Sequence, residues 1–209
     1  QTELAEVIAG IRKITSGDIC FMNENIQKDS VKQRFEKGIS YISDDRHADG
    51  LVIDMSLKDN MLLKHYDKEP YSKKGIFNKK PMDDLADSAI EKFQIKTTGT
   101  SGKESIVKLL SGGNQQKVVV GKWLARNSRV VIFDEPTRGI DVGAKYEIYQ
   151  LILDLANRDK VVMVVSSEMP ELLGICDRIL VMSGGRLAGE VDAKNTTQEE
   201  IMALAAKYV

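Results

Sequence analysis

Hydrophobic positions in the last third of the chain form three short continuous runs, over residues 130–133, 161–165 and 179–182. Strands that are apolar on both faces are typical of parallel sheets covered by helices, so we expect these runs in such a sheet. Between the first two runs, apolar residues recur at the spacing of one helical face: Ile148, Leu151, Ile152 and Leu155. The pattern predicts a strand–helix–strand crossover and therefore an α/β fold with a mostly parallel sheet.

The first fifty residues predict shorter elements. Apolar residues from Leu4 onward share a helical face that we expect to end at Ser16-Gly17. A strand over 18–22, a helix over 30–37 and a strand over 39–42 follow, and then a charged loop over 44–50. Because a helix seldom begins without a cap, we expect further residues upstream of this sequence.

The middle of the chain has a helical character. A helix is predicted from Ser56, a Lys-rich loop over 66–80, a second helix over 81–93 and a polar linker over 97–104. The lysines of the loop, at 73, 74, 79 and 80, indicate a solvated insertion, with contact to acidic lipid head groups as the alternative. Near the end of the chain, Gly184-Gly185 predicts a hairpin turn, and Thr197 with Glu200 predicts a capping box.

Composition narrows the class of protein. The 209 residues are 42% hydrophobic, which allows one folded domain with a real core, or one domain with a small lobe. The 30 basic and 31 acidic residues give a net charge of -1, which disfavours nucleic acid as a partner. The longest apolar runs have about five residues, far fewer than the roughly 20 that a membrane-spanning helix needs.

One candidate anion site lies at residues 111–114, Ser-Gly-Gly-Asn, just before a helix predicted to run to about Arg126. Paired glycines after a serine leave backbone N–H groups bare at a helix N-terminus, where a phosphate can dock. A flexible loop with a serine cap is the simpler interpretation of this segment by itself.

A second candidate site begins 23 residues after Ser111, where an apolar strand ends in Asp134-Glu135. Ligands of open α/β sheets bind at this end of the strands. One carboxylate can hold Mg²⁺, usually through water, and the next can orient or deprotonate an attacking water. A solvated acidic turn would explain the pair alone, but the order and spacing of both segments favour a joint role.

These segments resemble the motifs of ATP-binding cassette (ABC) ATPases. Residues 110–117 are similar to the signature motif, 130–135 to the Walker B strand and 139–141 to the D-loop. The sequences of residues 134–145 and 166–173 are similar to those in the second cassette of two-cassette ATPases that drive bacterial monosaccharide import, of the ribose and galactose/methylgalactoside types. The resemblance implies a P-loop NTPase (RecA-like) core over 1–55 and 127–209, and a helical lobe carrying the signature over 56–126.

The resemblance also implies two half-sites for ATP and Mg²⁺. The chain's own half-site would use Gln1 and Thr2 as the last positions of the phosphate loop, Thr2 and Asp134 toward Mg²⁺, and Glu135, Ser167 and Asp44 in catalysis. The half-site offered to a second cassette would use the signature residues Ser111, Gly112, Gly113 and Asn114, with Asp141 of the D-loop.

The chain departs from the family pattern in places that weaken its own half-site. The glycines that cradle the phosphates are absent, and Gln1 is neutral where the family has lysine. Generic cassettes have glutamine at the position of Asp44 and histidine at the position of Ser167. At both positions this chain is instead similar to the sugar-import relatives, which usually have an acidic residue at the first. We therefore expect slow hydrolysis or none at this half-site, and no ATP hydrolysis by the chain alone.

The expected partners follow from the same resemblance. They are a second cassette, either the N-terminal half of a longer chain or a homodimer mate, membrane permease subunits and, indirectly, a sugar-binding protein. The expected location is peripheral, on the cytoplasmic face of the inner membrane. The alternatives are a structural half that catalyses nothing, an importer of nucleosides or other furanose compounds, and a chromosome-maintenance or repair ATPase, which would carry long coiled-coil insertions.

Overall fold

A parallel three-stranded sheet lies at the centre of the computed structural model, which describes all residues except 98, 100–101, 126–127 and 209. The strand order is β3 (Ile39–Ile42), β6 (Val130–Asp134) and β7 (Val161–Val165). The helix α6 (Val142–Ala156) joins β6 to β7, so the predicted crossover and the α/β class are confirmed. Ile42 pairs with Phe133 and Asp134 with Val165, which brings the three carboxyl ends to one edge of the sheet.

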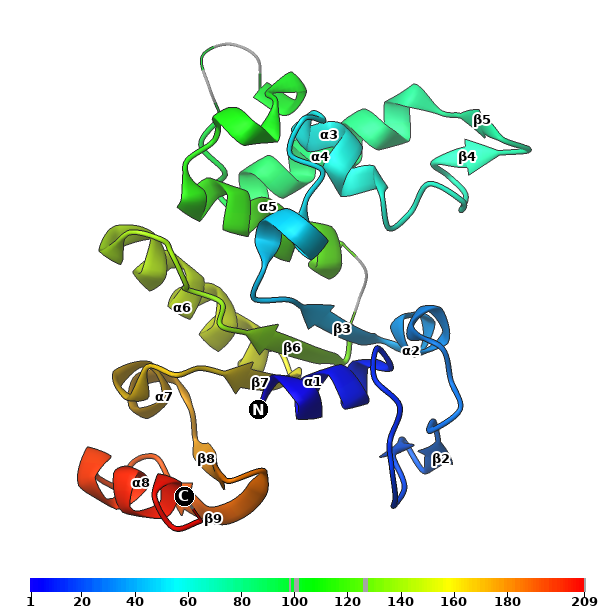
Figure 1. Ribbon diagram of the computed structural model, residues 1–209. Coiled ribbons are helices and arrows are strands. Elements are labelled where there is room, and N and C mark those ends of the chain that lie inside the picture. Colours follow the sequence, from blue (N-terminus) through cyan, green and yellow to red (C-terminus); the bar gives the residue numbers. More distant parts are fainter. Residues whose placement is uncertain (98, 100–101, 126–127, 209) are drawn as a thin grey trace.

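Both faces of this sheet are covered (Figure 1). The helix α1 (Thr2–Ala9) packs its buried Ala5 and Ala9 into a cluster that contains Ile132 of β6. The neighbouring positions Val131 and Phe133 face the opposite cluster, which includes α5 (Gly112–Leu124) and α6. This coverage explains why β6 is apolar at successive positions rather than at alternate ones.

The third apolar run lies outside this sheet, contrary to the expectation. The strand β8 (Arg178–Ser183) pairs antiparallel with β9 (Arg186–Asp192). Burial alternates along β8, where Ile179 and Val181 are buried and Leu180 is 50% exposed. The buried face packs on α8 (Gln198–Ala205). This continuous apolar run therefore forms a strand with only one covered face.

The turns, caps and element ends predicted near the two ends of the chain are confirmed in part. The Gly184-Gly185 turn, with φ of 51° and 75°, and the Thr197–Glu200 capping box are confirmed. The helix α1 ends at Gly10, with φ of 85°, earlier than the predicted Ser16-Gly17. The predicted strand over 18–22 is only β1 (Cys20–Phe21), paired with β2 (Glu24–Asn25). The helix α2 (Val31–Lys37) ends at Gly38, as expected, and the structure adds a Ser30 capping box at its start.

The helical lobe gathers above the sheet in Figure 1. It contains α3 (Leu57–Leu62), the hairpin of β4 (Ser72–Lys73) and β5 (Ile76–Phe77), α4 (Lys79–Lys92) and α5. The predicted end of α5 at Arg126 and the domain boundary at 126–127 lie outside the described residues, as does part of the linker over 97–104. One buried cluster runs from Met61 and Phe93 of the lobe to Phe133 of the sheet, so the lobe shares its core with the rest of the chain.

Within the described part of the chain, no helix combines the length and the hydrophobicity that crossing a bilayer requires.

Candidate functional site

Asp134 is the centre of the candidate site, at the carboxyl end of β6. Its side chain is fully buried, and both of its oxygens accept a hydrogen bond. The Thr2 hydroxyl donates to Oδ1 at 3.3 Å, and the Tyr41 hydroxyl of β3 donates to Oδ2 at 2.9 Å. Hydroxyl donors from two other segments therefore fix the orientation of this carboxylate before any ligand arrives.

The electrostatics of this carboxylate favour a cation. Burial raises the pKa of Asp134 above its ordinary value, and the nearby Asp44 carboxylate adds to the rise. The hydroxyls of Tyr41 and Thr2 act in the opposite direction but only in part. Because burial penalises a buried negative charge, a bound cation would relieve that penalty.

Glu135 and Ser167 meet at the same edge of the sheet. The Ser167 backbone N–H donates to Glu135 Oε1 at 2.8 Å, and the Glu135 N–H donates to the Val165 carbonyl at 2.8 Å. Glu135 has a φ of 46°, a region that costs a non-glycine residue about 1–3 kcal/mol. The surrounding contacts hold this conformation, which turns the carboxylate toward the loop that follows β7.

Asp44 lies beside these residues on the loop after β3. Its Oδ2 pairs with Arg138 at 3.2 Å, at a surface position. From the same loop, the guanidinium of Arg46 donates to the carbonyl oxygens of Arg138 at 2.9 Å and Gly139 at 3.3 Å. The loop that carries Asp44 is therefore tied to the segment that follows Glu135.

The helix tip at 111–114 lies next to that same segment. Ser111 is exposed and caps α5 by accepting from the Asn114 N–H. The Asn114 side chain donates to Ser111 Oγ at 2.8 Å and accepts from the Lys96 N–H at 2.8 Å. A Cβ on Gly112 would lie 3.4 Å from both the Gly139 carbonyl oxygen and an Arg46 nitrogen. Thus the tip is well ordered, and its contacts run to residue 139.

Gly113 and Asp141 make the tip compact. A Cβ on Gly113 would lie only 2.4 Å from Ala144 Cβ, so no larger residue fits between α5 and α6 without a shift. Asp141 caps α6 by accepting from the Ala144 N–H at 2.9 Å and is itself exposed. The close approach of the two helices explains the glycine.

The predicted residues thus form two groups. Thr2, Asp134, Asp44, Glu135 and Ser167 lie at the edge of the sheet, while Ser111, Gly112, Gly113, Asn114 and Asp141 lie at the adjoining tips of α5 and α6. Gln1 is exposed at the N-cap of α1, where its side chain makes no capping hydrogen bond.

The donor set at the sheet edge fits a hard divalent cation. Asp134 and Thr2 offer one carboxylate and one hydroxyl side by side. Around no point of the described chain do three His, Cys or acidic side chains gather as metal ligands. Mg²⁺ usually keeps several waters and takes only one or two carboxylates besides substrate phosphates, so this small set suits it better than a cation that needs many protein ligands.

Tyr41 was missed by the sequence reasoning. The run 39–42 indicated a strand with alternating faces, yet all four of its residues are buried. The burial and the bond to Asp134 raise the pKa of the Tyr41 hydroxyl, so it stays a donor at neutral pH. The register places Tyr41 opposite Ile132, two residues before Asp134, and only the pairing of β3 with β6 reveals this.

Glu171 was also missed. It lies in α7 (Met169–Ile175), and it is buried. Its carboxylate accepts from the hydroxyls of Tyr149 at 2.6 Å, Ser166 at 2.7 Å and Thr137. Burial alone would raise the pKa of Glu171, but these donors and Lys145 bring it below its usual range. The carboxylate connects the loop carrying Ser167 to the segment after Glu135.

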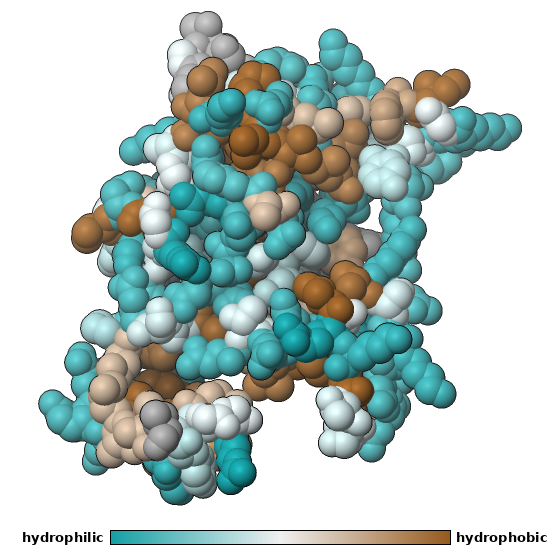
Figure 2. Space-filling model, viewed as in Figure 1, coloured by the Kyte–Doolittle hydropathy of each residue, from teal (hydrophilic) through white to brown (hydrophobic). Residues whose placement is uncertain are grey.

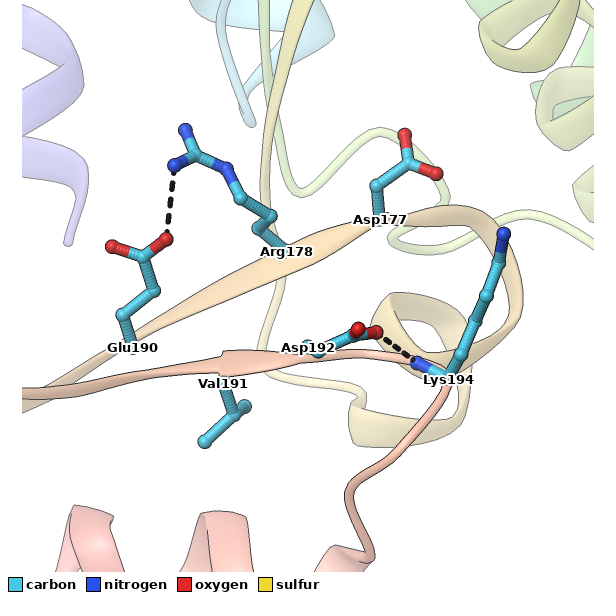
Figure 3. Close-up of a pocket in the computed structure, with 6 residues that line it drawn as sticks. All are labelled: Asp177, Arg178, Glu190, Val191, Asp192 and Lys194. Carbon is cyan, nitrogen blue, oxygen red and sulfur yellow. Dashed lines mark hydrogen bonds and ion pairs between the residues drawn. The ribbon is translucent and has the colours of Figure 1, made fainter.

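A hollow on the described surface lies away from these residues. It measures about 510 Å³ and is lined by residues of β8, β9 and the segments next to them (Figure 3). Among its lining residues, Arg178 pairs with Glu190 at 2.9 Å and the Lys194 backbone N–H donates to Asp192 at 2.9 Å. The hollow does not belong to the candidate site.

Comparisons with solved structures agree with this architecture. The fold matches a nucleotide-free ATP-binding cassette from an ABC transporter with a TM-score of 0.77, at 20% identity, over 97% of this chain and 78% of that one. It matches the dimeric cassette MJ0796 bound to ADP and Pi with a TM-score of 0.75, at 21% identity, over 93% and 81%. The cassette fold predicted from the motifs is confirmed.

Curated relatives are considerably more similar in sequence. A galactose/methyl galactoside import ATP-binding protein, MglA 2 of Photobacterium profundum, is 42% identical over all of this chain and 41% of its own length. The proteins of that name, MglA, in Clostridium perfringens and Treponema pallidum are 43% and 42% identical. The chain spans about two fifths of these relatives. The family model described as "ABC transporter" matches residues 1–138. The chain therefore belongs to the ABC transporter family and has the fold of its ATP-binding cassettes.

Proposed function

We propose that this chain is the second cassette of an ATPase that powers import of a monosaccharide, of the galactose/methyl galactoside or ribose type. The observation that carries the proposal is the buried Asp134 carboxylate, oriented by Thr2 and Tyr41 beside the Glu135–Ser167 contact. The names of relatives at 42–43% identity support the sugar class. Glu135 supports sugar over nucleoside import, because some nucleoside-type importers that resemble this family lack this acid.

In this proposal, each residue of the chain's own half-site has a separate role. Asp134 and the Thr2 hydroxyl hold Mg²⁺ partly through water, and the ion supplies neutralising charge to ATP phosphates when bound. Glu135 orients or deprotonates the attacking water, and Ser167 offers a hydroxyl to the phosphate. Asp44 stands beside them, fixed by Arg138.

The second group of residues serves a partner cassette. Ser111, Gly112, Gly113 and Asn114 complete the partner's ATP site, with Asp141 alongside. In support, Asp141, Val142 and Gly143 are exposed, and Val142 and Tyr146 leave 84% and 64% of their surface uncovered. Exposed apolar side chains next to an ordered helix tip are typical of a surface that another protein covers.

The complex would also contain membrane permease subunits and, outside the membrane, a sugar-binding protein. This chain would sit at the cytoplasmic face of the inner membrane as a peripheral subunit. ATP hydrolysis would drive the permease, while the permease and the binding protein choose the sugar.

The test uses the longer two-cassette protein with its permease. Glu135→Gln should lower Mg-ATPase turnover measurably but by less than about twofold, because general-base removal costs about 10²–10⁴-fold at the affected site while the other site, which we expect to be the faster one, continues. Substituting the acid that follows the other cassette's Walker B strand serves as the matched control. If only the control change lowers turnover, this cassette is the non-catalytic half that forms our second candidate.

Slow hydrolysis at the chain's own half-site is tested separately. Gln1 and Ser167 lack the positive charge that lysine and histidine would bring to a developing phosphate charge. The double variant Gln1→Lys, Ser167→His in the same longer protein should therefore raise turnover. Unchanged turnover would contradict this explanation and leave the assignment of Glu135 intact.

A further inference from the structure

The hairpin of β4 and β5, together with the first two residues of α4, forms an exposed basic segment of the helical lobe. Every residue from Lys73 to Lys80 is exposed, in the order Lys-Lys-Gly-Ile-Phe-Asn-Lys-Lys. The segment carries four positive charges and no acidic residue. In Figure 1 it projects sideways from the lobe, away from the sheet edge that carries Asp134.

Two bulky apolar side chains lie between the lysine pairs. Ile76 is 75% exposed and Phe77 is 58% exposed. They follow the turn at Lys74-Gly75, where both residues have positive φ, and they pair with Lys73 and Ser72 across the hairpin. Figure 2 shows brown and teal atoms side by side on this projection. A two-stranded hairpin with no core beneath it gains nothing from these apolar groups unless something else covers them.

The charges of the hairpin are mostly uncompensated within the described part of the chain. Lys73 pairs with Glu69 at 3.4 Å, but both side chains are about 70% exposed, and such pairs contribute little. The acidic residue nearest along α4, Asp83, is already engaged by Lys58 and Lys103. A surface that offers both negative charge and an apolar interior matches this combination.

We propose that residues 73–80, the β4–β5 hairpin with the first two residues of α4, bind the surface of a membrane rich in anionic lipids, with the lysines on the head groups and Ile76 and Phe77 inserted among the acyl chains. Basic residues near such a surface contribute individually, and a large apolar side chain at the interface adds to the affinity. The proposal stands independently of the ATPase assignment, because it requires neither nucleotide nor permease.

The experiment uses the purified 209-residue chain and vesicles of phosphatidylcholine alone or with phosphatidylglycerol at about one part in four. We expect sedimentation with the anionic vesicles only, weakening as salt is added. Lys79→Gln with Lys80→Gln should weaken binding about 25-fold, at roughly fivefold per lysine. Ile76→Ser with Phe77→Ser should weaken it at least about tenfold.

Matched controls come from the opposite end of the molecule. Lys13→Gln with Lys28→Gln removes the same charge from exposed loop positions, and Ile11→Ser removes an apolar side chain that is 53% exposed. These variants should bind as the parent does. Equal binding to both kinds of vesicle, no binding, or equal losses in the controls would overturn the proposal.

Insertion is measured by fluorescence, since Trp123 is the only tryptophan. In a Trp123→Phe background, Phe77→Trp places a probe on the hairpin, and circular dichroism reports that the chain is folded. We expect a blue shift with anionic vesicles and quenching by brominated acyl chains. A probe that stays water-exposed while the chain sediments would show adsorption elsewhere on the surface and would refute the proposed insertion. A hairpin that instead docks on an acidic protein would give no signal with either kind of vesicle.

Discussion

Glu171 joins separate segments of the chain through one buried carboxylate, and replacing it with glutamine tests whether that junction supports the edge of the site. Its side chain is 3% exposed, and it accepts from Thr137, Tyr149 and Ser166. A hydrogen bond to a charged group contributes about 1.5–3 kcal/mol, and breaking a buried charged network costs about 3–5 kcal/mol. Glutamine keeps the shape and one acceptor oxygen, so we expect the free energy of unfolding to fall by about 3 kcal/mol.

Urea and thermal unfolding of the 209-residue chain measure this loss. A change of about 3 kcal/mol corresponds to a melting temperature lower by about 6–12 °C for a chain of this length. Glu168→Gln is the matched control, because Glu168 binds the same Lys145 at 2.6 Å but is 50% exposed. Surface pairs contribute at most about 1 kcal/mol. Equal losses in the two variants, or a loss below about 1 kcal/mol for Glu171→Gln, would refute the account of a charged junction.

The pH dependence gives a second signature of the same carboxylate. The folded-state pKa of Glu171 is below its unfolded value, so the unfolded chain takes up the proton first as the pH falls. The stabilisation is therefore full above the unfolded pKa, near 4.5, and is lost as the pH falls through the folded value. The difference in unfolding free energy between the parent and Glu171→Gln should shrink on acidification, and a difference independent of pH would contradict the assignment.

Three further changes probe other parts of the molecule. Asp134→Asn should leave the ligand-free chain as stable or more stable in thermal melts, because burial penalises the charge, and should abolish any stabilisation by added Mg²⁺; a clear loss of stability would contradict this. Gly113→Ala should cost about 1–3 kcal/mol in urea unfolding, because the new Cβ would lie 2.4 Å from Ala144 Cβ; an unchanged midpoint would show that α5 shifts freely. Burial and the nearby Lys64 lower the pKa of Lys122 from 10.5 to about 8, so the parent should gain stability between about pH 8 and 10.5 relative to Lys122→Met, and parallel pH curves for the two would refute the shift.

Features that depend on neighbours in sequence were predictable. The apolar runs of β6 and β7 with an amphipathic helix between them determine a crossover, because only one handed arrangement buries all three. Thr197 begins a helix with the predicted capping box, since its hydroxyl accepts from the backbone N–H three residues later. The order of the Ser-Gly-Gly and Asp-Glu segments indicated the family for the same reason, as both are local patterns.

Features that depend on contacts between distant segments were not predictable. The run 179–182 is as apolar as β6, yet its partner is β9, and no periodicity in four residues distinguishes the two cases. The Tyr41 hydroxyl donates to a carboxylate that is 93 residues away in sequence. The Glu171 carboxylate accepts from hydroxyls that are up to 34 residues away. The contacts of Arg46 likewise cross a long stretch of sequence, since its guanidinium donates to the carbonyls of residues 138 and 139.

Arg46 makes the two groups of site residues mechanically dependent on each other. Its guanidinium holds the carbonyls of residues 138 and 139, while the Arg138 side chain returns to Asp44 on Arg46's own loop. Anything that displaces residues 139–141 at the exposed tip must therefore carry the Asp44 loop with it or break these bonds. Because Asp44 lies close enough to raise the pKa of Asp134, such a displacement also changes the charge environment of the buried carboxylate. A displacement at the tip that preserves these bonds would therefore also move the Asp44 loop at the acidic edge of the sheet.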